Sequence, residues 1–105
     1  MPAAHAPTTI ETIISMLEAL GTELGDAGWI ARLMVAPGRA PCLYVQNPEP
    51  GAAALAEHVY AALRDDGFWF WWSWAEPIAR EPGDTAALIR RALRAAPEFS
   101  SPEDP

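Results

Sequence analysis

The spacing of apolar residues changes along the chain, and each change marks the limit of an expected element. From residue 8 onward, apolar residues recur every three or four positions with polar residues mostly between them, which is the pattern of an amphipathic helix. Thr8 and Glu11 have the spacing of a capping box, so the helix is expected to begin at Thr8. Gly21 is its expected end, because glycine adopts a left-handed cap most easily. The expected buried stripe is Ile10, Ile13, Ile14, Leu17 and Leu20.

Two short apolar runs, residues 29–35 and 42–46, flank the sequence APGRAP and predict a β-hairpin. The expected register collects four apolar side chains on one face and leaves Arg32 and Tyr44 on the other. The expected pairs are Val35 with Leu43 and Leu33 with Val45.

Two further segments have helical spacing. Residues 52–64 follow the breaker sequence NPEPG, and residues 84–95 begin at Asp84, a plausible N-cap. Both stripes are apolar: Leu55, Val59, Ala62 and Leu63 in the first, and Leu88, Ile89, Ala92 and Leu93 in the second. The solvent side of the last helix carries Arg90, Arg91 and Arg94, which are expected to complement the helix dipole and to aid solubility. The alternative for these arginines is contact with phosphate, as in an accessory nucleic-acid binding protein.

Residues 68–74 read FWFWWSW and hold six aromatic rings in seven positions. Aromatic residues favour strands, and alternate strand residues point to opposite faces of a sheet. One face of this strand is therefore expected to carry four rings and the other face two. The first group is Phe68, Phe70, Trp72 and Trp74, and the second is Trp69 and Trp71. Neither group is expected to face water without a partner.

The expected fold is α+β, in the order αββαβα, with a three-stranded sheet and helices on at least one face. The first strand is expected in the middle of an antiparallel sheet, between the second strand and the aromatic strand. A second arrangement places the aromatic strand beside the second strand and parallel to it. In both, the aromatic strand is the most buried element. Residues 8–96 form one domain, and the proline-rich segments 1–7 and 97–105 are expected to be mobile tails.

Charge narrows the choice of partners. The 105 residues carry 14 acidic and seven basic side chains, a net charge of -7, and all seven basic residues are arginine. Such a chain is repelled by phosphate backbones, so nucleic acid is not expected as a partner. The N-terminal segment lacks the basic residues of a secretory signal. No apolar run approaches the ~20 residues that span a bilayer. The chain is therefore expected to be cytoplasmic and not to bind membranes.

Catalytic chemistry has no obvious residues to perform it. Cys42 and His58 are the only thiol and the only imidazole outside the tails, and nothing in the sequence indicates that they meet. Cys42 has no CxxC partner, and no two imidazoles share a helical face, so no metal site and no cofactor are expected. The sequence predicts a protein that is not an enzyme.

Residues 67–77 read GFWFWWSWAEP and are followed by a short acidic loop and a last helix, DTAALIRRALRA. This part of the chain, about its last third, resembles a group of small uncharacterised actinobacterial proteins that share a tryptophan-rich WFWWSWAE-like strand near the C-terminus. The resemblance implies a bacterial cytoplasmic protein that works beside regulatory proteins. It implies no catalytic residue.

The expected function is that of a protein-interaction module, either a homodimer or an accessory subunit of another, regulatory protein. The alternative is a small-molecule binding module with an aromatic pocket near Trp72, Trp74 and Glu76. In a third interpretation, the rings are simply core. The residues expected to form the interaction or ligand surface are Trp69, Trp71, Trp72, Trp74 and Glu76.

Overall fold

A computed structural model of the chain describes residues 9–49 and 55–94. These residues form two helices and five strands. In chain order the elements are α1 (Thr9–Asp26), β1 (Ile30–Met34), β2 (Cys42–Gln46), β3 (Ala56–Arg64), β4 (Gly67–Trp72), β5 (Pro77–Ala79) and α2 (Pro82–Ala92). The strands make one antiparallel sheet in sequence order, from β1 at one edge to β5 at the other. The expected cap at Thr8 and the expected tails, residues 1–7 and 97–105, lie outside the described residues.

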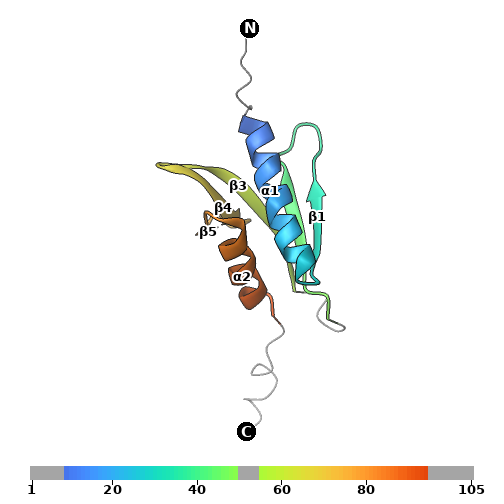
Figure 1. The fold of residues 1–105 in the computed structure, drawn as a ribbon. Helices are drawn as coiled ribbons and strands as arrows, with labels where there is room; N and C mark the ends of the chain where they lie inside the picture. Colours follow the sequence, from blue (N-terminus) through green and yellow to red (C-terminus); the bar gives the residue numbers. More distant parts are fainter. Residues whose placement is uncertain (1–8, 50–54, 95–105) are drawn as a thin grey trace.

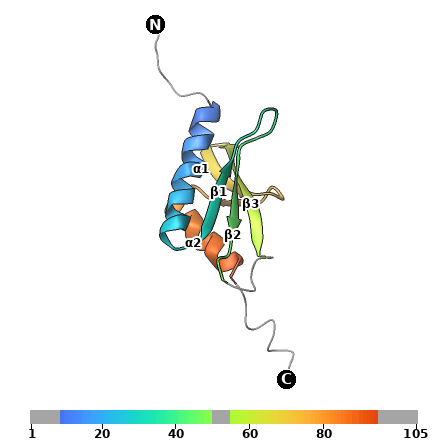
Figure 2. The same cartoon turned by 90° about the vertical axis from the view of Figure 1, so that its right-hand side faces the viewer.

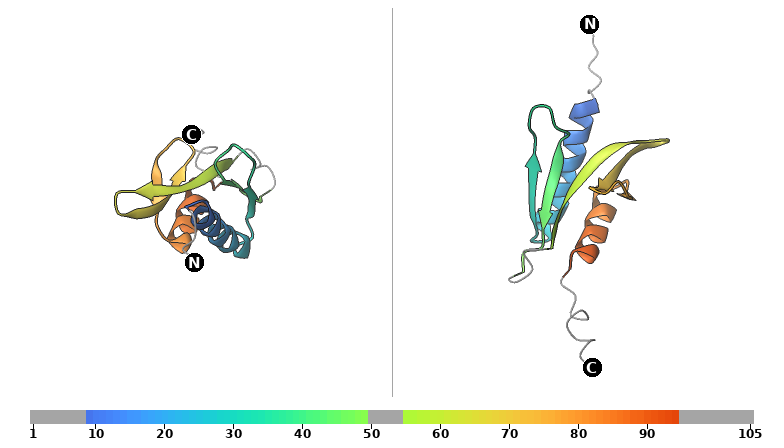
Figure 3. Two further views of the ribbon diagram at one scale, coloured as in Figure 1. Left: turned by 90° about the horizontal axis from the view of Figure 1, so that it is seen from above. Right: turned by 180° about the vertical axis from the view of Figure 1, so that it is seen from behind.

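Both helices pack on the same face of the sheet. α1 contacts β1, β2 and β3, and α2 contacts α1 and β5. Figure 1 shows the two helices side by side in front of the strands, and the turned views in Figures 2 and 3 show the strands behind them with no helix on their far side. One face of the sheet is therefore covered, and no described element covers the other.

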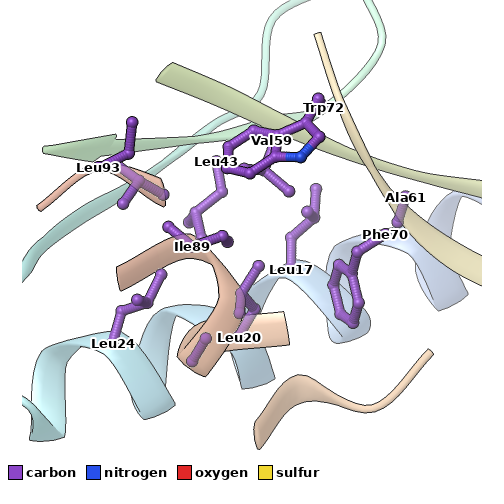
Figure 4. Close-up of a cluster of buried hydrophobic side chains, with 12 residues drawn as sticks. Leu17, Leu20, Leu24, Leu43, Val59, Ala61, Phe70, Trp72, Ile89 and Leu93 are labelled. Atoms are coloured by element: carbon purple, nitrogen blue, oxygen red, sulfur yellow. The ribbon is translucent and has the colours of Figure 1, made fainter. Parts of the chain in front are cut away.

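The core lies between the helices and the covered face (Figure 4). Side chains from α1 and α2 meet inward-pointing residues of β2, β3 and β4, because alternate strand residues point to one side. The largest fully buried apolar residues are Leu17, Leu20, Leu24, Leu43, Val45, Val59, Phe70 and Ile89.

The first helix is longer than its sequence pattern predicts. It continues through Gly21 to Asp26, and Gly21 lies over β2, where a Cβ atom would make an ordinary van der Waals contact, 3.5 Å from Leu43 Cδ1. The helix ends in a Schellman motif: Gly28 has a φ of 85°, and the Trp29 amide donates to the Leu24 carbonyl at 3.0 Å. Gly28, not Gly21, is thus the glycine that stops α1.

The β1–β2 hairpin is present, but its register differs by two residues from the expected one. Leu33 pairs with Leu43, and Ala31 pairs with Val45. Since a shift of two residues keeps every side chain on its face, Arg32 and Tyr44 still lie opposite the core.

The prediction of a helix over residues 52–64 is wrong, and with it the three-stranded sheet. Residues 56–64 form β3, and residues 52–54 lie outside the described part of the chain. Val59 and Ala61 point to the core while His58 and Tyr60 point away, so the true period is two. Apolar residues on both faces of the strand hid that period, because they can also be sorted at helical spacing.

Both expected strand orders are also wrong. β1 is an edge strand, and the aromatic strand β4 lies between β3 and β5. All its pairings are antiparallel. The most buried strand is β2, with Cys42, Leu43 and Val45 buried, because it lies inside the sheet between β1 and β3 and α1 packs on its Leu43 and Val45 side.

The last helix begins at Pro82 with Glu81 as N-cap, three residues before the expected N-cap, Asp84. Its buried face is Thr85, Ala86 and Ile89, whereas Leu88 is exposed. The predicted stripe was therefore only partly correct. In a helix with few large apolar residues, the elements that it packs against decide which face is buried. For α2 these elements are α1 and β5.

We expect Phe70→Ala to lower the free energy of unfolding by about 3–5 kcal/mol, because it empties a fully buried site. Leu63→Ala is the matched control. Leu63 belongs to the neighbouring strand and the same sheet face but is 60% exposed, so its loss is expected to be about 0.5 kcal/mol or less. Urea denaturation measures both. Equal losses would contradict the assignment of the core.

Candidate interaction face

The side of the sheet that the helices leave uncovered is called the open face. The registers place Tyr44 beside His58, Tyr60 beside Trp71, and Ala62 beside Trp69 on this side. Its strand residues are Ile30, Arg32, Met34, Cys42, Tyr44, Gln46, Ala56, His58, Tyr60, Ala62, Arg64, Trp69 and Trp71. The face therefore runs across β1 to β4.

Aromatic rings form the centre of the open face. The rings of Tyr44 and His58 lie 5.4 Å apart at 58°. The Trp71 indole Nε1 donates to the Ala62 carbonyl at 3.2 Å, which holds this ring down on β3. All these aromatic side chains are half-buried, although no helix covers them. The strand registers place these rings at neighbouring positions of one surface.

The charge of the open face differs from that of the whole chain. None of its strand residues is Asp or Glu, although the chain carries a net charge of -7. Arg32 and Arg64 are its charged residues, and the Arg64 guanidinium lies 4.9 Å from the Trp69 ring and 5.9 Å from the Trp71 ring. Such contacts over aromatic faces stabilise both partners.

Three hollows adjoin one another on the open face. One of 430 Å³ is lined by Met34, Cys42, His58 and Tyr60, and one of 370 Å³ shares Met34 and His58 with it. A third, of 320 Å³, lies beyond Tyr60 toward Trp71. Because neighbouring hollows share lining residues, they are parts of one uneven surface and not separate pockets.

Cys42 and His58, which no sequence pattern brings together, line the same hollow. Cys42 is buried and lies beside Tyr60. Burial raises the pKa of the Tyr60 phenol, and the neighbouring Cys42 adds to that shift. The tyrosine is therefore a neutral hydroxyl at physiological pH and offers a hydrogen bond to whatever covers the face.

A network at the β3–β4 turn fixes Trp69 on the open face. The Trp69 indole Nε1 donates to Asp66 Oδ1 at 3.4 Å, and Arg80 donates to Asp66 Oδ2 at 3.3 Å. The Arg80 guanidinium also lies 5.9 Å from the Trp69 ring. The hydrogen bond from Trp69 is the main reason that the pKa of Asp66 is lowered.

The other expected site residues form a separate cluster. The rings of Trp72 and Trp74 stack with centroids 4.9 Å apart at 7°, and the Trp74 indole donates to Glu76 Oε1 at 2.8 Å. Trp72 is buried, whereas Trp74 is 55% exposed in the turn after β4. That turn places Ala75 in the left-handed region, with a φ of 69°.

The structure thus divides the five expected residues between two places. Trp69 and Trp71 lie on the open face, as their alternation with Phe70 and Trp72 predicts. Trp72, Trp74 and Glu76 engage one another instead. The sequence interpretation missed Tyr44, His58 and Tyr60 as site residues, and the alternation of His58 and Tyr60 with the core residues Val59 and Ala61 is the signal that could have found them.

Comparisons with protein-family models, with curated proteins and with solved structures find no match to this chain. The resemblance of residues 67–77 to actinobacterial proteins therefore stays a prediction. Among the described residues, neither helix has both the length and the apolar character that crossing a bilayer requires.

The lowered pKa of Asp66 predicts a pH-dependent contact. Because the folded-state pKa lies below the usual value of 3.8, the contact stabilises the fold above that pH and is lost as the pH falls through the folded pKa. We expect the Trp69 Nε1–H resonance to shift in NMR with a midpoint below 3.8. Trp69→Phe should raise the midpoint of the Asp66 carboxyl carbon. A midpoint at or above 3.8 in the unchanged protein would contradict this contact.

Ala75→Gly is expected to stabilise the protein. A left-handed conformation costs a non-glycine residue about 1–2 kcal/mol, and glycine adds about 0.5–1 kcal/mol of unfolded-state entropy, so the gain is about 0.5–1 kcal/mol. Thermal unfolding measures it. Ala36→Gly is the control, because Ala36 also lies in a loop but does not have a positive φ. A loss of stability at residue 75 would refute the strained turn.

Proposed function

We propose that this protein is a non-enzymatic protein-interaction module that forms a homodimer through the open face. One observation supports the proposal most: a five-stranded sheet is covered by helices on one side only, and its other side carries a surface of aromatic rings. Sheets that keep one face in water usually place polar residues there. Here that face carries Tyr44, Tyr60, Trp69 and Trp71 at its centre.

Charge makes the open face the surface through which two copies of the chain approach one another with the least repulsion between carboxylates. Two copies that each carry -7 repel one another over most of their surface. On the open face no strand residue is acidic, and the carboxylate of Asp66, which contacts Trp69 at its edge, is paired with Arg80. Its arginines can lie over rings of the other copy, as Arg64 already lies over Trp69. Two-fold pairing is also the commonest closed symmetry.

The size of the face requires a dimer to use nearly all of it. Strand spacing and rise give the four strands a face roughly 19 Å wide and 17 Å long, or about 320 Å² in projection before side-chain relief is added. Stable interfaces bury about 800 Å² per partner. Most of the open face must therefore be covered, and Ala62, between Trp69 and Trp71, lies inside the covered area.

Two other functions expected from the sequence, an accessory subunit and a small-molecule binding module, remain alternatives. An unlike partner, with this chain as its accessory subunit, would use the same face, and the resemblance to actinobacterial proteins favours a regulatory, cytoplasmic setting. A small-molecule site near Trp72, Trp74 and Glu76 has less support, because Trp74 donates its indole hydrogen to Glu76 and stacks on Trp72. A homodimer is the simplest arrangement that covers the whole face.

Size-exclusion chromatography with light scattering tests the homodimer. We expect the unchanged protein to dimerise with rising concentration and Ala62→Glu to remain monomeric, because the new carboxylate would be buried in the contact. Ala92→Glu is the matched control: Ala92 is equally an exposed alanine but lies on α2, away from the open face. This variant should dimerise normally.

A strict monomer at every concentration would overturn the homodimer. A dimer that persists in Ala62→Glu would show that another surface is used. Should Ala62→Glu fail the circular-dichroism check for folding, Arg32→Glu makes the same test, because Arg32 is an exposed residue of the open face.

A further inference from the structure

A second site lies at the opposite side of the molecule, on the helix side, and is here called the arginine cavity. It has a volume of 620 Å³ and lies between the last turns of α2, the loop from α1 to β1, and the segment that follows β2. Its main lining residues are Trp29, Asn47, Glu49, Arg90, Arg91 and Arg94. None of these residues belongs to the open face.

The walls of the arginine cavity are held by specific contacts. The Schellman motif that ends α1 fixes Trp29 through its amide, which donates to Leu24. The buried Asn47 donates from Nδ2 to the Leu93 carbonyl at 2.8 Å and so joins the end of β2 to the last turn of α2. Its Oδ1 accepts from the Glu49 amide at 2.9 Å. The site is therefore formed by elements that are tied together.

The charge at this site is unusual for the chain. Three of its seven arginines converge on one cavity, although acidic residues outnumber basic ones two to one. Among the described residues, none of the three guanidiniums has a carboxylate within 4.0 Å, and the ion pair that does occur joins Arg80 to Asp66. Complementing the α2 dipole explains cations in the last turn. It does not explain their convergence beside a tryptophan.

We propose that the arginine cavity binds a free nucleoside phosphate. A guanidinium group can donate two parallel hydrogen bonds to the oxygens of a phosphate. Three guanidiniums exceed what the one carboxylate of the lining, Glu49, needs as a counter-charge. Trp29 is half-buried at the same cavity and offers an aromatic surface to a base. The volume lies within the range of small-ligand sites. A nucleic-acid strand would extend beyond the cavity over a chain of net charge -7, which repels it.

Isothermal titration calorimetry of the full chain with ADP tests the proposal. We expect one site per chain, with affinity that falls as salt is raised. Adenosine and pyrophosphate, which each keep half of the ligand, should bind more weakly. The double variant Arg91→Ala/Arg94→Ala should weaken ADP binding by about tenfold or more. Arg39→Ala removes an arginine from the β1–β2 loop and should leave the affinity unchanged.

Three results would overturn the proposal. If ADP does not bind the unchanged protein at low salt, the proposed ligand is wrong. If the double variant binds ADP with equal affinity, the arginine cavity is not the binding site. A single-stranded oligonucleotide that binds more tightly than ADP, and loses its affinity in the double variant, would assign the arginines to nucleic acid. Because the double variant leaves the open face intact, light scattering of the same samples separates failure here from failure of the dimer.

Discussion

Both helices pack on the same face of the sheet, and the rest of the structure depends on that asymmetry. α1 and α2 contribute the buried leucines and Ile89 that meet Leu43, Val59 and Phe70 from the strands. A chain of 105 residues buries one core, and here that core uses only one side of the sheet. The aromatic residues of the other side are then left to pack against one another or against a second chain.

Local sequence pattern predicted the elements whose period was unambiguous. The aromatic strand alternates as expected, and the first hairpin keeps its faces despite a two-residue shift. It failed for β3, where His58 and Tyr60 on one face alternate with Val59 and Ala61 on the other. A strand with apolar residues on both faces has no clear period of two. Because this segment was predicted as a helix, the expected sheet lacked its central strand.

The same error explains how much of the candidate site could be foreseen. Trp69 and Trp71 were expected on one face because their alternation is local, whereas Tyr60 joins them only through the pairing of β3 with β4. Trp74 and Glu76 do not lie on the open face, because a tight turn follows Trp72. The arginine cavity could not be predicted from the sequence, because Trp29 and Arg91 come to line one cavity only when α1 and α2 pack together.

The molecule thus separates two surfaces of unlike chemistry, an open face of rings whose strand residues include no carboxylate and an arginine cavity between α2, the α1–β1 loop and the segment after β2. Hydroxyl-radical footprinting of dilute and concentrated protein tests the central claim that the open face is covered by a second copy. The account predicts that Trp69 and Trp71 become protected at high concentration, while Trp74, which lies outside the open face, is oxidised equally in both samples. Equal oxidation of Trp69 and Trp71 at both concentrations would contradict it.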